Sequence, residues 1–306
     1  MVQRILEIKL GALGDFVLTT GAMKTLREHH KQAHITLLTT KPFVKIAEQS
    51  GYFDAVIVDP RSRNPMDWWQ ICKKTIAEGE FDLIYDFQNN KRTKKRYFNF
   101  ARLFCRKKLI WACWATGGWH VREVQKKHRF SLGSIKTYHT PMTFHKPDLT
   151  FMHGPETYFN ELPEQYVLII PGCSKAHPYK RWPAENYADL AKRLGDKGIF
   201  SIILGTNEEK DVIDTILKGN DKAVSFLNKA TLSDIPALAK RALATVGNDT
   251  GPTHMAALVG KPCLYLFSER TRKSANHFDN ITNLFGENIS DISTQTVFDT
   301  LTNLIK

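Results

Sequence analysis

The sequence predicts an α/β protein with two Rossmann-like halves, each built on a doubly wound parallel sheet. Its 306 residues are more than one small core needs and suit two domains of about 150 residues each. In both halves, short β-branched or apolar runs alternate with amphipathic stretches, which is typical of a parallel sheet covered by helices on both faces. A polar, proline-containing region at residues 137–163 has weak periodicity and separates the two series.

The individual elements follow from these patterns in chain order. In the first half we expect strands at residues 4–9, 33–39, 55–59 and 83–86, with helices at residues 20–30, 41–49 and 67–78. In the second half we expect strands at residues 166–170, 200–204, 223–226, 244–246 and 263–267, with helices at residues 184–197, 208–217, 232–241, 253–259 and 297–305. Ligands of open parallel sheets bind beyond the carboxyl ends of the strands, so the loops after strands are the candidate sites.

Composition argues against several classes of protein. No apolar run approaches the roughly 20 residues of a membrane-spanning helix, and the N-terminus lacks a signal-peptide core, so we expect a soluble, cytoplasmic protein. Five cysteines without a C-x-x-C pair argue against a zinc ribbon or a disulfide framework. They are expected to be reduced packing residues, with Cys173 the exception to watch because it lies in a glycine-containing loop.

The net charge of +12 is concentrated in one segment. Residues 91–129 contain thirteen Lys or Arg and a single acid, Glu123, whereas the rest of the chain is neutral. This pattern favours a local docking surface for something anionic over bulk nucleic-acid binding, although a solvated basic helix face is the plainer alternative.

The first candidate loop follows the first strand and contains Gly11, Gly14 and Asp15. The glycines permit a tight turn and close backbone approach to a ligand. Asp15 falls at the start of a helix, where it is either an acid that complements the helix dipole or a general base at the mouth of the sheet.

The second candidate loop, residues 171–183, follows the strand at 166–170. Its small residues and lysines favour a phosphate cradle, while ordinary surface charge remains the alternative for Lys180 and Arg181. The third, residues 246–254, combines a polar turn with an apolar helix and is the sharpest signal, because a helix start suits a diphosphate without any metal. Glu208 and Glu209 follow the strand expected at residues 200–204. Either they accept hydrogen bonds from a ribose or they cap the next helix.

Three motifs, in order along nearly the whole chain, resemble glycosyltransferase family 9, the heptosyltransferases that build the inner core of lipopolysaccharide. Residues Ile8–Asp15 (IKLGALGD) are similar to its opening strand and Gly-x-x-Gly-Asp loop. Residues Lys180–Pro183 (KRWP) resemble its Lys-x-Trp-Pro element, and residues Asn248–His254 (NDTGPTH) resemble its Asp-(Ser/Thr)-Gly-x-x-His signature.

The resemblance implies the family's GT-B fold, in which two Rossmann-like domains face each other across a cleft. It implies an N-terminal acceptor domain at residues 1–160, a C-terminal nucleotide-sugar donor domain at residues 161–292, and a final helix at residues 293–306 that crosses back to the N-terminal domain. It further implies transfer of a sugar, heptose from ADP-heptose, onto an anionic glycolipid acceptor such as the inner core.

The resemblance also assigns roles to residues. Asp15 is implied as the catalytic base, with Gly14, Arg61, Arg63 and Arg122 at the acceptor. The donor-binding residues implied or expected are Ser174, Lys180, Glu208, Glu209, Asp249, Thr250, Gly251 and His254. We expect inverting transfer, in which a carboxylate takes the proton from the attacking hydroxyl. The sequence has no Asp-x-Asp motif of the metal-dependent transferases, so no metal or other cofactor is expected.

The basic segment departs from the family pattern. Its cations are interspersed with Trp111, Trp114 and Trp119, which predicts peripheral contact with the anionic inner membrane. The cations assigned to this surface are Lys91, Arg92, Lys94, Lys95, Arg96, Arg106, Lys107 and Lys108. A nucleic-acid-binding protein is the rival interpretation of this segment, but it leaves the three ligand loops unexplained, so no nucleic acid is expected. A nucleotide-sugar hydrolase or epimerase of the same fold is the other alternative.

Overall fold

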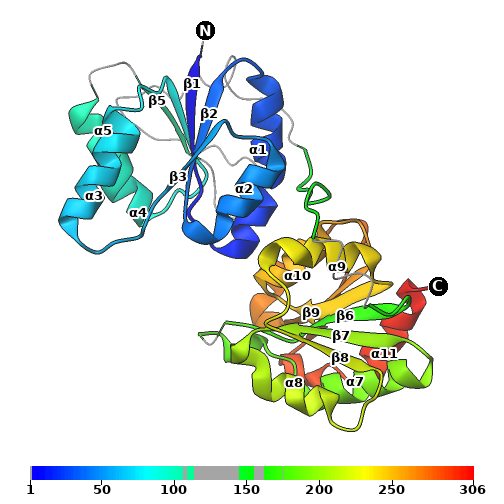
Figure 1. Ribbon diagram of the computed structural model, residues 1–306. Helices are drawn as coiled ribbons and strands as arrows, with labels where there is room; N and C mark the ends of the chain where they lie inside the picture. The colour runs from blue at the N-terminus through cyan, green and yellow to red at the C-terminus, as the bar shows by residue number, and fades with distance from the viewer. Residues whose placement is uncertain (1, 106–108, 114–144, 155–161, 175) are drawn as a thin grey trace. The chain divides into compact units, whose positions relative to one another are not determined.

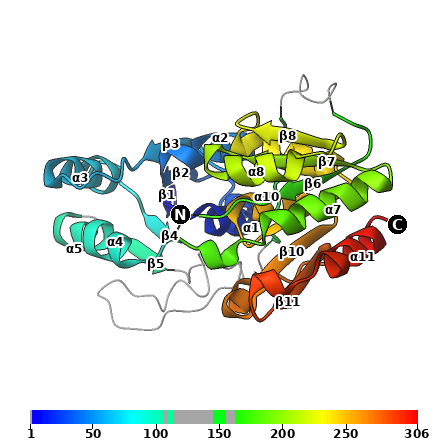
Figure 2. The same ribbon diagram turned by 90° about the horizontal axis from the view of Figure 1, so that it is seen from below.

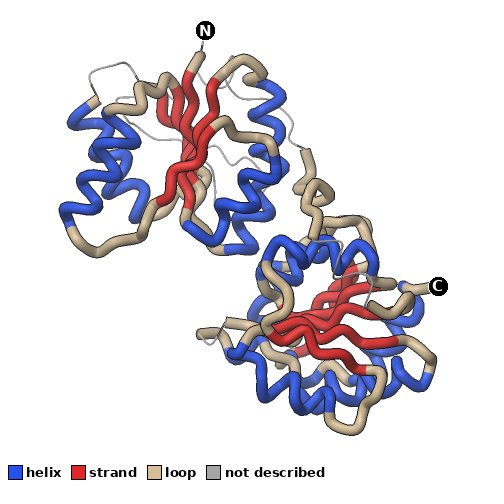
Figure 3. The backbone as a smooth tube through the Cα atoms, viewed as in Figure 1, coloured by secondary structure: helices blue, strands red, loops and turns tan. Residues whose placement is uncertain are grey.

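The chain forms two compact α/β units, Met1–Phe151 and Met152–Lys306. The computed structural model describes residues 2–105, 109–113, 145–154, 162–174 and 176–306. Each unit is a sheet with helices on both of its faces (Figures 1 and 3). The α/β class and the two Rossmann-like sheets predicted from the sequence are confirmed, and the division falls before the boundary that was predicted at residue 160.

The N-terminal unit has a five-stranded sheet whose order is β3-β2-β1-β4-β5, and every pair of neighbouring strands is parallel. The strands are β1 (Arg4–Ile8), β2 (His34–Thr39), β3 (Ala55–Val58), β4 (Leu83–Asp86) and β5 (Ile110–Cys113). Figure 1 shows α1 (Leu13–His29) and α2 (Val44–Ser50) on one face of this sheet. The other face carries α3 (Pro65–Cys72), α4 (Lys91–Thr93) and α5 (Asn99–Phe104).

Short helical turns complete this unit: the 3-10 turn η1 (Lys41–Phe43) precedes α2, and the π turns η2 (Lys73–Ala77) and η3 (Lys94–Phe98) extend α3 and α4. The core beneath α3 and α5 includes Leu6, Ile8, Tyr97, Phe100 and Trp111. Burial of these side chains is what holds the basic helical segment on the sheet.

The C-terminal unit has a six-stranded parallel sheet of order β11-β10-β9-β6-β7-β8. Its strands are β6 (Tyr166–Ile170), β7 (Phe200–Gly205), β8 (Ala223–Leu227), β9 (Ala244–Asn248), β10 (Cys263–Ser268) and β11 (Ile281–Gly286). Counted from the start of this unit, the order is 3-2-1-4-5-6, which is the dinucleotide-binding arrangement.

Five α-helices cover this second sheet in the described part of the unit. Figures 1 and 2 show α7 (Ala184–Asp196), α8 (Lys210–Leu217) and α11 (Thr294–Leu304) on one face. The opposite face carries α9 (Ile235–Arg241) and α10 (Gly251–Ala257). Short 3-10 turns lie at η6 (Pro178–Lys180), η7 (Asn207–Glu209), η8 (Leu232–Asp234), η9 (Glu269–Ser274) and η10 (Ile289–Asp291).

The final helix, α11, is part of the C-terminal unit. Its Val297 and Leu301 are fully buried, and they lie in the same hydrophobic cluster as Leu190 and Leu194 of α7. This packing makes α11 part of the second core, and the return of residues 293–306 to the N-terminal domain, which the resemblance implies, stays a prediction.

Two further differences from the expected elements concern the start of α1 and the elements that were not predicted. The helix expected at residues 20–30 begins at Leu13, because Phe16 and Val17 are buried and extend it past the poor helix former Gly14. The helices at residues 91–104 and the strands β5 and β11 were not predicted. Within the described residues, no helix is both long enough and apolar enough to cross a bilayer.

Candidate functional site

Both sheets bring predicted site residues to the place where their strand order reverses. In the N-terminal sheet this place lies between β1 and β4, and the loop after β1 leads into Asp15. In the C-terminal sheet it lies between β6 and β9, which are followed by residues 171–183 and 249–254. Ligands of open α/β sheets bind outside the carboxyl ends of the strands at such points.

A pocket of about 220 Å³ opens at the carboxyl edge of the C-terminal sheet. It belongs entirely to the C-terminal unit and is formed by the ends of β6, β7 and their loops, the turn at Thr231, and the start of α10. Four of the predicted donor residues line it: Ser174, Glu208, Glu209 and Thr250. These four side chains thus lie at one pocket, and their binding of the donor stays a prediction.

Glu209 has a structural role within this pocket wall. Its Oε2 accepts hydrogen bonds from the amide of Thr206 at 2.9 Å and from the Thr206 hydroxyl at 2.8 Å, which forms a capping box. The capping alternative weighed from the sequence is therefore correct for Glu209. Glu208 is exposed at the pocket lining and is the carboxylate with access to a ligand.

Beside the pocket, Lys180 and Asp249 form a partly buried ion pair. Lys180 Nζ lies 2.5 Å from Asp249 Oδ2, although the residues are far apart in sequence and come from the loops after β6 and β9. The Lys180 side chain is only 19% exposed, so Lys180 is not an ordinary surface charge. Burial alone would raise the pKa of Asp249, but hydrogen bonds from His254 and Lys180 outweigh burial and hold that pKa below its usual 3.8.

His254 orients Asp249 from the other side. Its Nε2 lies 3.2 Å from Asp249 Oδ1, and its Nδ1 contacts the Tyr265 hydroxyl at 2.9 Å and the Asn276 amide nitrogen at 3.0 Å. Because an amide NH2 group can only donate, Nδ1 is the acceptor and Nε2 carries the hydrogen that is donated to Asp249. Gly251 begins α10 directly after this cluster.

Asn248, which sequence reasoning did not single out, connects the two loops. It is fully buried, and its Oδ1 accepts from the amide of Trp182 at 3.1 Å and the hydroxyl of Tyr187 at 3.0 Å. Its Nδ2 donates to the carbonyl of Pro171 at 2.8 Å. Asn248 thus fixes the loop that carries Lys180 against the end of β9. An amide directly before Asp249 at a strand end was the available signal.

Cys173 lines the same pocket as a packing residue. It is buried, its Sγ donates to the carbonyl of His177 at 3.4 Å, and burial raises the pKa of its thiol. The nucleophile is the thiolate, so these surroundings do not activate Cys173.

In the N-terminal unit, Asp15 lies in the first turn of α1, as the sequence predicted. Lys9, which was not predicted, is fully buried nearby, and its Nζ donates to the carbonyl of Phe87 at 3.4 Å. Burial lowers the pKa of Lys9, while the carboxylates of Asp15 and Asp86 act in the opposite direction. Asp15 therefore shares its surroundings with a second carboxylate and a buried cation.

The loop between β1 and α1 needs glycine at position 11. Gly11 has a φ of +124°, and a Cβ there would lie 3.2 Å from the ring of Phe43 and 3.5 Å from Arg61 Nη2. The positive φ, together with the close ring of Phe43, is what requires glycine at this position.

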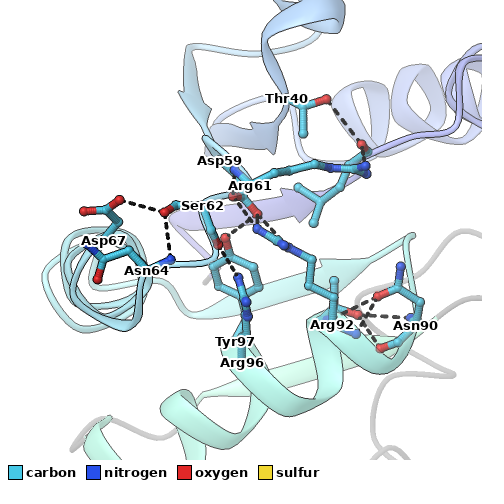
Figure 4. A network of polar contacts seen from close by, with 12 residues as sticks. Thr40, Asp59, Arg61, Ser62, Asn64, Asp67, Asn90, Arg92, Arg96 and Tyr97 are labelled. Carbon is cyan, nitrogen blue, oxygen red and sulfur yellow. Dashed lines mark hydrogen bonds and ion pairs between the residues drawn. The ribbon is translucent and has the colours of Figure 1, made fainter.

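Arg61 is held by its own loop, as Figure 4 shows. Its Nη2 donates to the carbonyl of Leu10 at 2.7 Å, and its amide donates to Asp59 Oδ1 at 2.6 Å. Its φ of +55° is unusual for a residue with a side chain. Asp59 is buried and also accepts from Arg92 and from the Tyr97 hydroxyl. Arg63 is exposed, and Arg122 lies outside the described residues.

The predicted basic surface needs correction at several positions. Arg92 is not a free surface cation, because it donates three hydrogen bonds of 2.7–3.2 Å to Asp59. Arg96 is half-buried and donates to the carbonyl of Ser62 at 3.2 Å. Trp111 is 3% exposed in the core, so it is not an interfacial residue.

The remaining cations of that surface divide into two groups. Lys91, Lys94 and Lys95 are exposed as predicted. Arg106, Lys107 and Lys108, together with Trp114 and Trp119, lie outside the described residues.

Comparison with known proteins agrees with this arrangement. The chain is 31% identical over 106 residues to lipooligosaccharide heptosyltransferase 2 of Haemophilus influenzae, an alignment that covers 32% of this chain and 31% of that protein. It thus spans about a third of this relative's length. It is 20% identical over 300 residues to the lipopolysaccharide core heptosyltransferase OpsX of the same organism, covering 92% of this chain and 84% of OpsX.

The fold is also that of a solved heptosyltransferase. The structure of E. coli ADP-heptose lps heptosyltransferase II matches with a TM-score of 0.73 and 19% identity, over 99% of this chain and 98% of that chain. The family model of glycosyltransferase family 9 (heptosyltransferase) matches residues 122–299, more than half of the chain and nearly all of the C-terminal unit with its pocket. This chain therefore belongs to glycosyltransferase family 9.

Proposed function

We propose that this protein is an inverting heptosyltransferase that transfers heptose from ADP-heptose to the inner core of lipopolysaccharide, without a metal ion. Membership of family 9 supports glycosyl transfer, and the solved relative of the same fold is described as an ADP-heptose lps heptosyltransferase. The transfer would take place at the cytoplasmic face of the inner membrane.

The observation that carries the proposal is the pocket at the carboxyl edge of the C-terminal sheet. Its volume of 220 Å³ lies below the range of about 300–1,000 Å³ typical of sites for whole drug-sized ligands, which suits the nucleoside end of the donor. Glu208 would accept hydrogen bonds from ribose hydroxyls, as carboxylates do at the same place in other Rossmann-like sheets. Ser174 and Thr250 also line the pocket and would offer hydroxyl groups to the donor.

The diphosphate and sugar would then extend from the pocket to Lys180 and Asp249. The ammonium group of Lys180 would turn from Asp249 towards the phosphates and stabilise the charge that develops on the leaving group. Asp249 remains oriented by His254 and would accept hydrogen bonds from sugar hydroxyls.

On the acceptor side, Asp15 would take the proton from the attacking hydroxyl as its oxygen bonds to the anomeric carbon and the bond to the diphosphate breaks. The reaction inverts the anomeric centre because the hydroxyl attacks opposite the leaving group. Arg61 and Arg63 would hold anionic groups of the acceptor, and the exposed Lys91, Lys94 and Lys95 favour contact with an anionic membrane.

A transfer assay tests the proposal directly. Purified protein is incubated with ADP-heptose and a heptose-deficient core acceptor, and the product is analysed by mass spectrometry and by NMR of the new linkage. We expect mass gain by one heptose and an anomeric configuration opposite to that of the donor. Free heptose in equal yield with and without acceptor would instead indicate a hydrolase, and an altered nucleotide sugar would indicate an epimerase.

Replacement of the proposed base separates chemistry from binding. Asp15→Asn should lower turnover by about 10²–10⁴-fold, because a general base contributes about that factor. The dissociation constant of ADP, measured by calorimetry, should not change, since the donor pocket lies in the other unit. Near-normal turnover of this variant would remove the assignment of Asp15. Lys24→Asn, a change at another polar position of α1, is the matched control.

A further inference from the structure

The outer helices of the N-terminal unit carry most of the exposed large apolar side chains. Five such side chains are exposed within the described residues, and four of them lie on α3 and α5. These four, named here the α3/α5 patch, are Met66 (66% exposed), Trp69 (40%), Leu103 (67%) and Phe104 (46%). A concentration of this kind on one surface marks an interaction site more often than scattered apolar residues do.

The two aromatic members of the patch contact each other and are anchored in the core. The ring centroids of Trp69 and Phe104 are 4.9 Å apart with the rings nearly perpendicular, so the aromatic side chains of the two helices pack edge to face. The buried Phe100 contacts both rings, at 5.0 Å from Trp69 and 4.7 Å from Phe104. Both views of the ribbon place α3 and α5 side by side (Figures 1 and 2). The exposed groups are therefore held in place by a folded cluster.

The adjoining helical segment is strongly positive. Residues 91–104 contain six Lys or Arg and no acid. Arg92 and Arg96 bond to Asp59 and Ser62, as described above. The other four cations, at positions 91, 94, 95 and 102, are exposed, and the turn that carries Lys94 and Lys95 continues directly into α5.

We propose that the α3/α5 patch inserts into the interface of an anionic lipid bilayer, with the exposed cations of residues 91–102 on the lipid headgroups. Tryptophan and aliphatic side chains that project beside lysines have the composition of surfaces that lie in the headgroup region. The proposal names this surface in place of the buried Trp111. It deepens the membrane contact of the proposed function and rests on it, although lipid binding itself requires neither donor nor acceptor.

Other occupants fit the patch less well. A second copy of the chain would form a two-fold contact, in which the same cations of both copies face each other across the apolar centre. Single-stranded nucleic acid would use free aromatic faces for base stacking, whereas here the rings pack on one another and aliphatic Met66 and Leu103 are the most exposed members. An anionic bilayer satisfies both the apolar and the positive parts.

Sedimentation with lipid vesicles tests the proposal. The full-length protein is mixed with vesicles of equal parts phosphatidylglycerol and phosphatidylcholine, and with vesicles of phosphatidylcholine alone. We expect binding to the anionic vesicles that weakens at high salt. The double variant Leu103→Ser/Phe104→Ser should bind at least about tenfold more weakly, because two apolar side chains no longer enter the interface.

Matched variants separate the apolar from the charged contribution. Lys94→Gln/Lys95→Gln should also lose about tenfold in affinity, and its remaining binding should depend less on salt. Val58→Thr, at the fifth exposed apolar side chain, and Lys192→Gln/Lys197→Gln, with the same change of charge in the C-terminal unit, should bind like the wild type. Circular dichroism confirms that each variant is folded.

A second measurement follows the patch without disturbing it. Lipids brominated in the upper acyl region should quench part of the tryptophan fluorescence, and Trp69→Phe should lose that part. Wild-type affinity of Leu103→Ser/Phe104→Ser for anionic vesicles would overturn the proposal, as would binding of oligonucleotides in preference to vesicles or a dimer that this variant abolishes. Transfer to a soluble acceptor fragment should be unaffected by Leu103→Ser/Phe104→Ser, so failure of lipid binding and failure of the transferase function give different results.

Discussion

Each unit holds a buried carboxylate at the carboxyl edge of its sheet, and the two carboxylates are used differently. Asp59 follows β3 and Asp249 follows β9, and each pairs with a cation from a distant part of the chain. Asp59 is 1% exposed, and the guanidinium of Arg92 binds both of its oxygens. Asp249 is 5% exposed, and Lys180 makes one contact to one of its oxygens beside the pocket of the C-terminal unit.

The difference follows from the two cations. The planar guanidinium of arginine matches a carboxylate in a fixed geometry, whereas the ammonium group of lysine is a point charge on a flexible stem. Arg92, together with Tyr97, is fully engaged in holding the loop of Arg61. Lys180 is a cation that a phosphate can draw away, while His254 keeps Asp249 oriented. We infer that the Arg92–Asp59 pair has a structural role and call it the brace. Lys180, in contrast, can leave Asp249 for a phosphate, and we call it the transferable charge.

The largest expected effect is the loss of the brace. Arg92→Met should lower the free energy of unfolding by about 3–5 kcal/mol, because removal of one partner leaves the buried Asp59 uncompensated. Urea unfolding of the full chain measures this change, with Lys91→Met as the exposed control on the same helix. The affinity for ADP should be unchanged in the folded protein. A loss below that of the Lys91 control would show that the pair does not stabilise the loop.

The pH dependence of stability should differ in sign between the two sheet edges. Burial raises the pKa of Asp86, at the end of β4, to about 6 from 3.8, in spite of hydrogen bonds from the backbone. Its stabilising contribution is therefore present below pH 3.8 and is lost as the pH rises through about 6, by up to about 3 kcal/mol. The pKa of Asp249 is lowered, so its contribution is present above pH 3.8 and is lost as the pH falls below that value.

Two amide variants test these signs. From about pH 4 to about pH 7, Asp86→Asn should gain stability relative to the wild type, because the cost of ionising the buried carboxyl is removed. Between about pH 2 and about pH 4, Asp249→Asn should lose stability relative to the wild type as the pH rises, because the wild type gains the contribution of the ionised carboxylate in that range. The measurement is the free energy of unfolding in urea at a series of pH values. Parallel curves for either variant and the wild type would contradict the corresponding assignment.

A smaller effect is expected for the transferable charge. Lys180→Met should weaken ADP binding about tenfold, equivalent to about 1.4 kcal/mol, while the stability of the protein changes little because His254 still contacts Asp249. Calorimetry with ADP measures the first quantity, and adenosine, which lacks phosphates, should bind both forms equally. Lys197→Met, at the exposed end of α7, is the control. An equal loss of affinity for ADP and for adenosine would show that Lys180 maintains the shape of the pocket and does not contact the phosphates.

The smallest effect should come from the second donor to Asp59. Tyr97→Phe removes the hydroxyl that lies 2.8 Å from Asp59 and leaves the ring in the core, so we expect a loss of about 1 kcal/mol. Since the same carboxylate positions the amide of Arg61, the KM for the acceptor should rise while kcat stays near the wild-type value. An unchanged KM for the acceptor would show that the hydrogen bond from Tyr97 to Asp59 does not influence acceptor binding.

Local patterns in the sequence were sufficient for the alternation of strands and helices and for the loops of the candidate site. The runs that became β6, β7 and β10 are mainly apolar, as expected for parallel strands buried on both faces. The glycines and polar residues after β6, β7 and β9 indicated Ser174, Glu208 and Thr250 as site residues, and these three side chains line one pocket. Strands β5 and β11 were missed, because neither was distinguished from its surroundings by its local pattern.

The order of residues was enough to assign most segments to a strand, a helix or a loop and to name the residue types at the strand ends, since both depend on neighbours along the chain. The pairing of Lys180 with Asp249, the pairing of Arg92 with Asp59 and the burial of Trp111 became visible only in the folded chain. These outcomes depend on which distant segments the sheet order brings together. The charge and size of a side chain do not reveal whether it will be buried or paired. The free energy of burying it depends on partners that lie far away in the linear sequence.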